Sequence, residues 1–296
     1  MLVFLMLFAC ADSDDNGTVG TPPGFGQSED NDREPNLSGQ SEDTGHGLSV
    51  GDPVQRIVLH EAFSGSNCGP CAPAAENIKA ALTDKAGQYT MLKYQLGSDP
   101  YITREAVDRR MLYLPDAETY SIPWIVADGI HEFHPNEMNH GGVYTAADFD
   151  ELVNHSAFLQ VDVAASINGQ SLSIEVELWP SIDFSGDDLR LLVAIKEGTT
   201  LNNVGSNGQT EFHDVFKKFV PDQGGTPLPN LIAGEAASYT FEYTFAGEYQ
   251  ADTAINNMVD HNAAHTVEDF DDLSVVAWVQ DMTTWEVFNA GMSASE

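Results

Sequence analysis

The sequence predicts an α/β domain at residues 52–157, followed by an all-β sandwich at residues 158–296. Three observations support this prediction. Cys68 and Cys71 lie between a short apolar run and a stretch of strong helix formers, the pattern of a strand-to-helix junction. From about residue 158 the apolar residues recur two apart, which is the period of half-buried strands. The chain of 296 residues is 42% hydrophobic, enough to build a packed core.

Two segments precede the predicted domains. The apolar run of residues 1–9 is too short to span a bilayer as a helix, and Leu7 to Cys10 resembles a bacterial lipobox, whose cysteine is lipidated after cleavage. We therefore expect residues 1–10 to be the remnant of a signal peptide, with Cys10 as the lipid anchor. Residues 11–51 carry nine carboxylates against one basic side chain and few apolar residues, which predicts a disordered acidic linker.

The first domain is expected to follow the order β-α-β-α-β-β-α. Pro73 falls in the first turn of the first predicted helix, where a proline is tolerated. The dipeptide Asp128-Gly129 predicts a tight turn between the last two strands. The expected strands are residues 57–59, 90–96, 124–127 and 130–133, and the expected helices are residues 74–86, 103–114 and 146–155.

The second part is expected to be an antiparallel, immunoglobulin-like β-sandwich of about seven strands, because alternation and turn signals follow one another along it. The stretch of residues 199–234 contains Gly224-Gly225 and three prolines, which predicts a large loop. Alternating apolar residues mark strands at residues 159–165, 172–178, 191–195, 239–245 and 275–279, and residues 285–287 would supply the last strand.

The pair Cys68 and Cys71 has the spacing of a dithiol/disulfide redox centre. A cysteine at a helix N-terminus lies near the positive end of the helix dipole, which favours the thiolate that attacks a disulfide. Two alternatives stay open. Histidines could complete a zinc site, although no second cysteine pair exists. A purely structural disulfide is possible, but a loop this short restricts the unfolded chain little.

A strand, a loop and a Cys-x-x-Cys motif that opens a helix resemble the arrangement of thioredoxins, so the first domain is predicted to be thioredoxin-like. The resemblance implies a cis-proline beside the disulfide, and Pro123, which directly precedes a strand, fits this position. It also implies that the backbone of Ile122 pairs with an extended substrate. Three more residues are assigned to the same substrate-binding face: Gly69, Pro70 and Trp124.

The resemblance assigns a role to each residue of the pair. We expect Cys68, the more exposed one, to be the attacking thiolate and Cys71, one turn into the helix, to be the resolving thiol. Thioredoxins place a buried carboxylate behind the pair as a proton shuttle, and Glu61 is the candidate, with a pKa raised by burial. A solvated carboxylate at a strand end is the alternative. His60 alternates with Glu61 and should face the other side of the sheet.

A closer resemblance covers most of residues 57–290. The run from Glu61 to Cys71 (EAFSGSNCGPC) is similar to the Glu-x-Phe-Thr-Gly-x-x-Cys-x-x-Cys signature of a Bacteroidetes family named after a 28-kDa outer-membrane protein. Members are lipoproteins with a thioredoxin-like domain followed by a β-rich domain, so the resemblance implies both features. This chain has Asn67 where thioredoxins usually carry tryptophan, and Trp124 where threonine commonly follows the cis-proline.

The charge narrows the classes of partner. A formal net charge of −34, from 46 acidic and 12 basic residues, argues against nucleic acids and anionic membrane surfaces as partners. No cofactor is predicted. No metal site is predicted either, because His131 and His134 would point to opposite faces of a continued strand, and with His140 they are interpreted as surface histidines of a loop.

The sequence thus predicts an exported, lipid-anchored thiol–disulfide oxidoreductase of the periplasm or outer membrane, with surface exposure as a further option. Its expected partners are protein or peptide thiols and disulfides, together with an external reductase or oxidase, and it would touch the membrane only through the lipid. The alternative is a cell-envelope binding or scaffolding lipoprotein whose β-sandwich carries the function.

Overall fold

The computed structural model describes residues 48–114, 122–134, 143–251 and 258–294, all of which belong to one compact unit. Cys10 with the predicted lipobox, and the predicted linker up to residue 47, lie outside the described residues. Among the described helices, none is long and apolar enough to cross a membrane.

The first part of the chain has the predicted order of elements. These are β1 (Val58–Ser64), α1 (Cys71–Ala81), β2 (Tyr89–Gln95), α2 (Arg104–Tyr113), β3 (Trp124–Ala127), β4 (His131–Phe133) and α3 (Ala146–Val153). Strand β1 is central, since it pairs with β2 in parallel and with β3 in antiparallel, and β4 pairs with β3. The predicted turn at Asp128-Gly129 joins β3 to β4, and Gly129 has the positive φ of 78° that glycine adopts at no steric cost.

Local capping residues explain where the helices begin. The Thr103 side chain caps α2 by accepting a hydrogen bond from the Ala106 amide, and Thr145 forms a capping box with Asp148 at the start of α3. Helix α1 begins at Cys71 and ends at Ala81, whereas the sequence predicted residues 74–86. The chain turns soon after Ala81, since Asp84 and Gly87 both have positive φ, and this turn ends the helix early.

The second part contains β5 (Leu159–Asn168), β6 (Ser171–Pro180), β7 (Leu189–Thr200), β8 (Phe212–Phe219), β9 (Thr226–Pro227), β10 (Ala237–Thr244), a 3-10 turn (Phe270–Asp272), β11 (Leu273–Asp281) and β12 (Val287–Met292). The prediction of one large loop at residues 199–234 is wrong, because β8 and β9 lie within it. The last strand begins at Val287 rather than Trp285, whose φ of 69° is incompatible with a strand.

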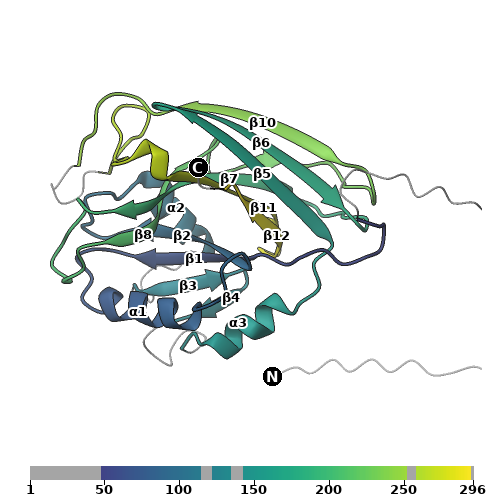
Figure 1. The fold of residues 1–296 in the computed structure, drawn as a ribbon, viewed down its shortest axis with the longest axis horizontal. Coiled ribbons are helices and arrows are strands. Elements are labelled where there is room, and N and C mark those ends of the chain that lie inside the picture. The colour runs from purple at the N-terminus through teal and green to yellow at the C-terminus, as the bar shows by residue number, and fades with distance from the viewer. Residues whose placement is uncertain (1–47, 115–121, 135–142, 252–257, 295–296) are drawn as a thin grey trace, which may run out of the picture. The chain divides into compact units, whose positions relative to one another are not determined.

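The two parts share one mixed sheet, which the sequence did not predict. Its nine strands follow the path β12-β11-β7-β8-β2-β1-β3-β4, with β9 added at β7. Strand β8 makes the junction, since it is antiparallel to β7 and parallel to β2, with Val215 opposite Lys93. Figure 1 shows the path across the molecule, with α1 and α3 on one side of β1, β3 and β4. The boundary predicted near residue 157 falls between α3 and β5.

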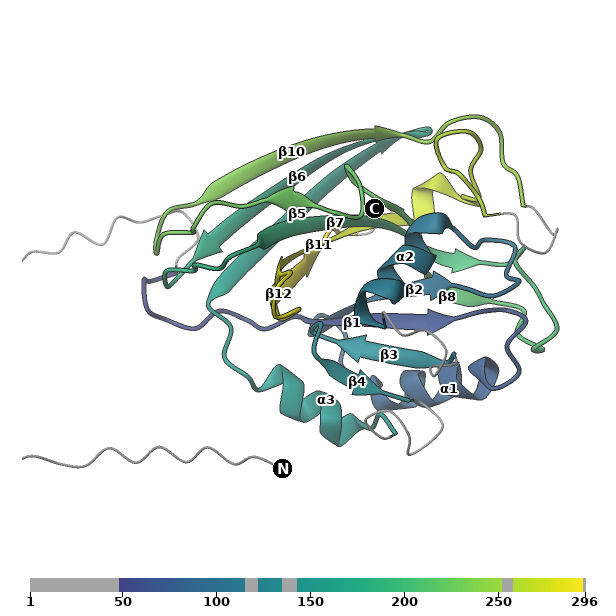
Figure 2. The same cartoon turned by 180° about the vertical axis from the view of Figure 1, so that it is seen from behind.

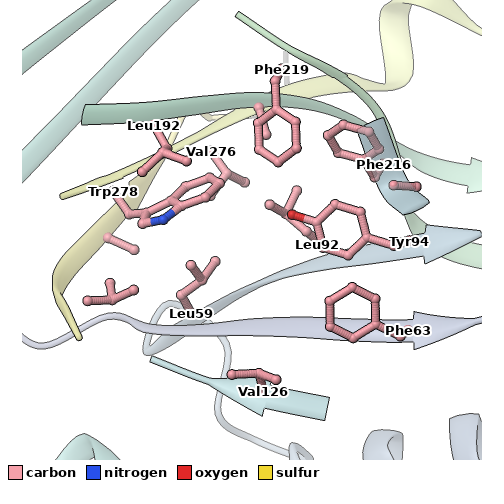
Figure 3. Close-up of a cluster of buried hydrophobic side chains, with 14 of the residues drawn as sticks. Leu59, Phe63, Leu92, Tyr94, Val126, Leu192, Phe216, Phe219, Val276 and Trp278 are labelled. Atoms are coloured by element: carbon pink, nitrogen blue, oxygen red, sulfur yellow. The ribbon is translucent and has the colours of Figure 1, made fainter. Parts of the chain in front are cut away.

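A sandwich is present, but one of its layers belongs to this shared sheet. The three-stranded sheet β10-β6-β5 covers β7, β11 and β12, as Figure 2 shows from behind. Between the layers lies an apolar core that includes Val161, Ile174, Val193 and Val275. A second core joins both parts of the chain, because Leu59 and Tyr94 pack with Leu192, Phe216 and Trp278 (Figure 3). The Cys-x-x-Cys segment and the sandwich therefore rest on continuous packing.

A third cluster, beneath α1 and α3, contains the fully buried His60, whose Nε2 lies 2.6 Å from the Tyr144 hydroxyl. Burial lowers the pKa of His60 to about 4, whereas the unfolded chain takes up this proton near pH 6.5. The stability contributed by neutral His60 is therefore complete above pH 6.5 and is lost as the pH falls to 4.

We expect the stability advantage of the wild type over His60→Gln to shrink by up to about 3 kcal/mol between pH 7 and pH 4. Urea unfolding at the two pH values measures this difference. The exposed His155→Gln substitution serves as the control and should track the wild type. An advantage over His60→Gln that stays constant across this range would contradict the prediction.

Candidate functional site

Cys68 and Cys71 form a disulfide at the N-terminal end of α1, with their Cα atoms 5.3 Å apart. Cys68 is half-buried, whereas Cys71 is only 1% exposed. The sequence had suggested that Cys71 lies one turn into the helix, but Cys71 is the first residue of α1. Cys68 is therefore the more accessible of the two disulfide-bonded residues.

The peptide bond between Ile122 and Pro123 is cis, and it lies against this disulfide. The carbonyl oxygen of Ile122 is 3.6 Å from the Cys68 Sγ atom. Pro123 is buried and lines a small cavity together with Cys71. The half-buried Ile122 thus presents its backbone beside the accessible sulfur.

The other residues assigned to the substrate face divide into two groups. Gly69 and Pro70 are exposed between the cysteines, and a Cβ atom placed on Gly69 would have no atom within 4 Å. Trp124, in contrast, is 1% exposed, and its ring stacks on Phe63 with the centroids 4.9 Å apart. The Trp124 ring is therefore part of the core and not of an exposed face.

Glu61 does not lie behind the disulfide, contrary to the expectation. It is fully buried on the face of β1 opposite to α1, while His60 and Ala62 face the α1 and α3 side, as alternation predicted for His60. Its carboxylate accepts two hydrogen bonds from the Arg109 guanidinium, at 2.7 and 2.8 Å. The Tyr94 hydroxyl donates a third, at 2.8 Å. Glu61 is thus half of a buried ion pair, and its position gives no support to proton transfer to Cys71.

The ionisable side chain behind the disulfide is Lys93, which the sequence reasoning missed. It lies opposite Ala62 in the parallel pairing of β1 with β2, and it is the charged residue among those that line the small cavity at Cys71. Lys93 is 8% exposed, and burial lowers its pKa, partly offset by the Asp214 carboxylate. A lysine inside the apolar run of β2 was the one sequence signal that could have identified it.

A groove of about 820 Å³ runs along α1. Its walls come from α1, including Ala72 and Ile78, from Lys93 on β2, and from the chain before and at the start of β8, including Gln209 and His213. The second part of the chain therefore forms one wall of the surface next to the disulfide.

The histidines that the sequence analysis interpreted as surface residues differ in their solvent exposure. His131 on β4 is half-buried, His134 is only 3% exposed and so is not a surface residue, and His140 lies outside the described residues. The described residues contain no group of three or more histidine, cysteine, aspartate or glutamate side chains that could hold a metal ion.

The fold and the site together define a mostly β protein with a mixed sheet, in which a Cys-x-x-Cys disulfide at a helix N-terminus lies beside a cis-proline. No protein-family model matches the chain. No curated protein matches it either.

Among solved structures, the chain is similar to HBP35 of Porphyromonas gingivalis, with 13% identity and a TM-score of 0.58 over 81% of this chain and 75% of that one. A protein from Agrobacterium tumefaciens is 11% identical, with a TM-score of 0.48 over 82% of this chain and 96% of that one. At this level of identity the similarity to HBP35 concerns the fold alone.

Proposed function

We propose that this protein is a thioredoxin-like thiol–disulfide oxidoreductase. The observation that carries the proposal is the disulfide of half-buried Cys68 with buried Cys71, placed 3.6 Å from the Ile122 carbonyl next to cis-Pro123. A disulfide exchanges when a thiolate reaches one of its sulfur atoms, so an accessible first cysteine and a protected second one suit the two steps.

In the reducing direction, the Cys68 thiolate attacks a disulfide of the substrate. A mixed disulfide forms, and one substrate thiolate leaves. The Cys71 thiolate then attacks the Cys68 Sγ atom, which closes the disulfide seen in the structure and releases the second substrate thiolate. Two electrons pass from the protein dithiol to the substrate, and an external dithiol reductant must return them. The 3.6 Å distance between the Ile122 carbonyl oxygen and the Cys68 Sγ atom supports a role of this backbone in aligning an extended substrate beside Cys68.

We also propose that the protein is exported and held at a membrane by a lipid on Cys10, in the periplasm or at the outer membrane. Its partners would be protein or peptide thiols and disulfides, with a separate reductase or oxidase. The lipobox-like run from Leu7 to Cys10 supports this localisation, and the resemblance of the Cys-x-x-Cys region to a family of Bacteroidetes lipoproteins agrees with it.

Insulin reduction with dithiothreitol as the electron source tests the activity. We expect Cys68→Ser to lower the rate to the uncatalysed background, because the attacking thiolate is gone. Cys10→Ser is the matched control and should keep the full rate, since Cys10 has no part in the exchange. A Cys68→Ser protein as active as the parent would refute the proposed function.

A further inference from the structure

The short segment of residues 65–67, directly before the disulfide, is held first by the loop that follows β2. The Asp99 carboxylate accepts a hydrogen bond from the Ser66 amide at 2.8 Å, and the Ser98 carbonyl accepts one from Asn67 Nδ2 at 2.8 Å. Ser66 is fully buried and Asp99 is 2% exposed. These contacts are local to the first part of the chain.

The same segment is held a second time by residues 203–209, from the connection between β7 and β8. The Asn207 amide donates to the Ser66 carbonyl at 3.0 Å, and Asn207 Nδ2 donates to the Gly65 carbonyl at 3.2 Å. A residue far along the chain thus satisfies two carbonyl groups of the segment that leads into the redox motif. We call residues 203–209 the clamp loop.

Close approach of the two backbones is part of this contact. A Cβ atom on Gly205 would lie 2.4 Å from the Ser66 carbonyl oxygen and 2.7 Å from Asn67 Oδ1, so only glycine fits there without displacement. The next residue, Ser206, donates its amide to Asn67 Oδ1 at 2.9 Å. The Asn67 side chain therefore bridges the clamp loop and the loop that follows β2.

We propose that the clamp loop positions Cys68, and that Asn207 and Asn67 are positioning residues that set the equilibrium of the Cys68–Cys71 couple. Because the segment is fixed on both sides, the two thiols of the reduced protein stay close together, at a high effective concentration for closing the disulfide. If the clamp loop is released, the thiols explore a wider range of separations, and the disulfide becomes easier to reduce.

This inference deepens the proposed function and rests on it, since the equilibrium matters biologically only if the pair exchanges disulfides. The relevant equilibrium is the one in which the protein dithiol and oxidised glutathione form the protein disulfide and two molecules of reduced glutathione. The double substitution Asn67→Ala/Asn207→Ala is predicted to lower the constant of this equilibrium. A roughly tenfold fall is expected, equal to about 30 mV towards a less negative potential.

Titration of the full chain with glutathione mixtures, followed by alkylation and mass measurement, gives this constant. Asn202→Ala is the matched control, because it removes an exposed asparagine just before the clamp loop and should leave the constant unchanged. Gly205→Ala pushes the two backbones apart and should shift the constant in the same direction as the double substitution. Asn207→Ala alone removes only side-chain hydrogen bonds. This variant can still be titrated if Gly205→Ala and the double substitution fold poorly.

An unchanged constant in folded Asn207→Ala and Asn67→Ala/Asn207→Ala would overturn the proposal. The measurement needs no catalysis, so it separates the two ideas. A parent protein that fails to reduce insulin would refute the proposed function while the glutathione constant still reported on the clamp loop.

Discussion

Replacing Arg109 with methionine is expected to lower the free energy of unfolding by about 3–5 kcal/mol. Arg109 and Glu61 are both fully buried and form a bidentate ion pair. Removing the guanidinium leaves the Glu61 carboxylate in the core without its counter-charge, which costs far more than the pair itself contributes to stability. Urea unfolding followed by tryptophan fluorescence measures the loss.

The size of this effect follows from what surrounds the pair. Arg109 Nη2 also donates to Gln280 Oε1 at 2.8 Å, so the guanidinium connects α2 and β1 to β11. Burial alone would lower the pKa of Arg109, but the Glu61 carboxylate and the Tyr113 and Tyr94 hydroxyls raise it overall, so the side chain stays charged in the core. One substitution therefore removes contacts between three elements of the fold.

Arg104→Met is the matched control, since Arg104 lies on the same helix and its side chain is 72% exposed in a surface pair with Asp108. It should cost less than about 1 kcal/mol. The double substitution Glu61→Met/Arg109→Met should recover much of the loss, because no buried charge is left unpaired. If Arg109→Met cost no more than Arg104→Met, the ion pair would not have the structural role assigned to it.

Gly129→Ala is expected to destabilise the fold by roughly 2–5 kcal/mol, from the strain of a left-handed residue and from overpacking. Gly129 has a φ of 78°, and a Cβ atom there would lie 1.8 Å from the Trp285 carbonyl oxygen. That oxygen accepts a hydrogen bond from Gln280 Nε2 at 2.6 Å, so it cannot move without breaking another contact. Thermal or urea unfolding measures the effect.

Gly87→Ala separates the two causes, because Gly87 has the same φ of 78° but nothing within 4 Å of the added Cβ atom. It should cost only the conformational strain, roughly 1–2 kcal/mol. Equal losses for Gly129→Ala and Gly87→Ala would show that the approach of the β3–β4 turn to Trp285 is unimportant for stability.

Local patterns in the sequence predicted the first part of the fold well. The order from β1 to α3 follows from apolar periodicity, helix formers and the Asp128-Gly129 turn, all of which act over a few neighbouring residues. The Cys-x-x-Cys motif between a strand and a helix placed the disulfide at the start of α1, and the resemblance to thioredoxins pointed to Pro123 as the cis-proline. Alternation put His60 and Glu61 on opposite faces of β1, since side chains in a strand alternate.

Strand β8 was missed because its pattern does not resemble an ordinary strand. Val215, Phe216 and Phe219 are buried, but so are Lys217 and Lys218, and Lys217 is paired with Glu197 inside the protein. A strand that packs on both faces loses the alternation of a half-buried one. Gly224-Gly225 and three prolines in the same stretch then favoured a loop.

What the sequence determined by itself is the local part of this protein, namely the Cys-x-x-Cys motif with its flanking strand and helix, and the resemblance of this pattern to thioredoxins pointed to the proline. What only the tertiary structure decided is how distant segments meet: β8 joins the two parts in one sheet, Lys93 rather than Glu61 lies behind Cys71, and Asn207 holds the segment before Cys68. The physical reason is that periodicity and turn chemistry act between near neighbours, whereas burial, ion pairing and close backbone approach depend on which segments the whole chain brings together.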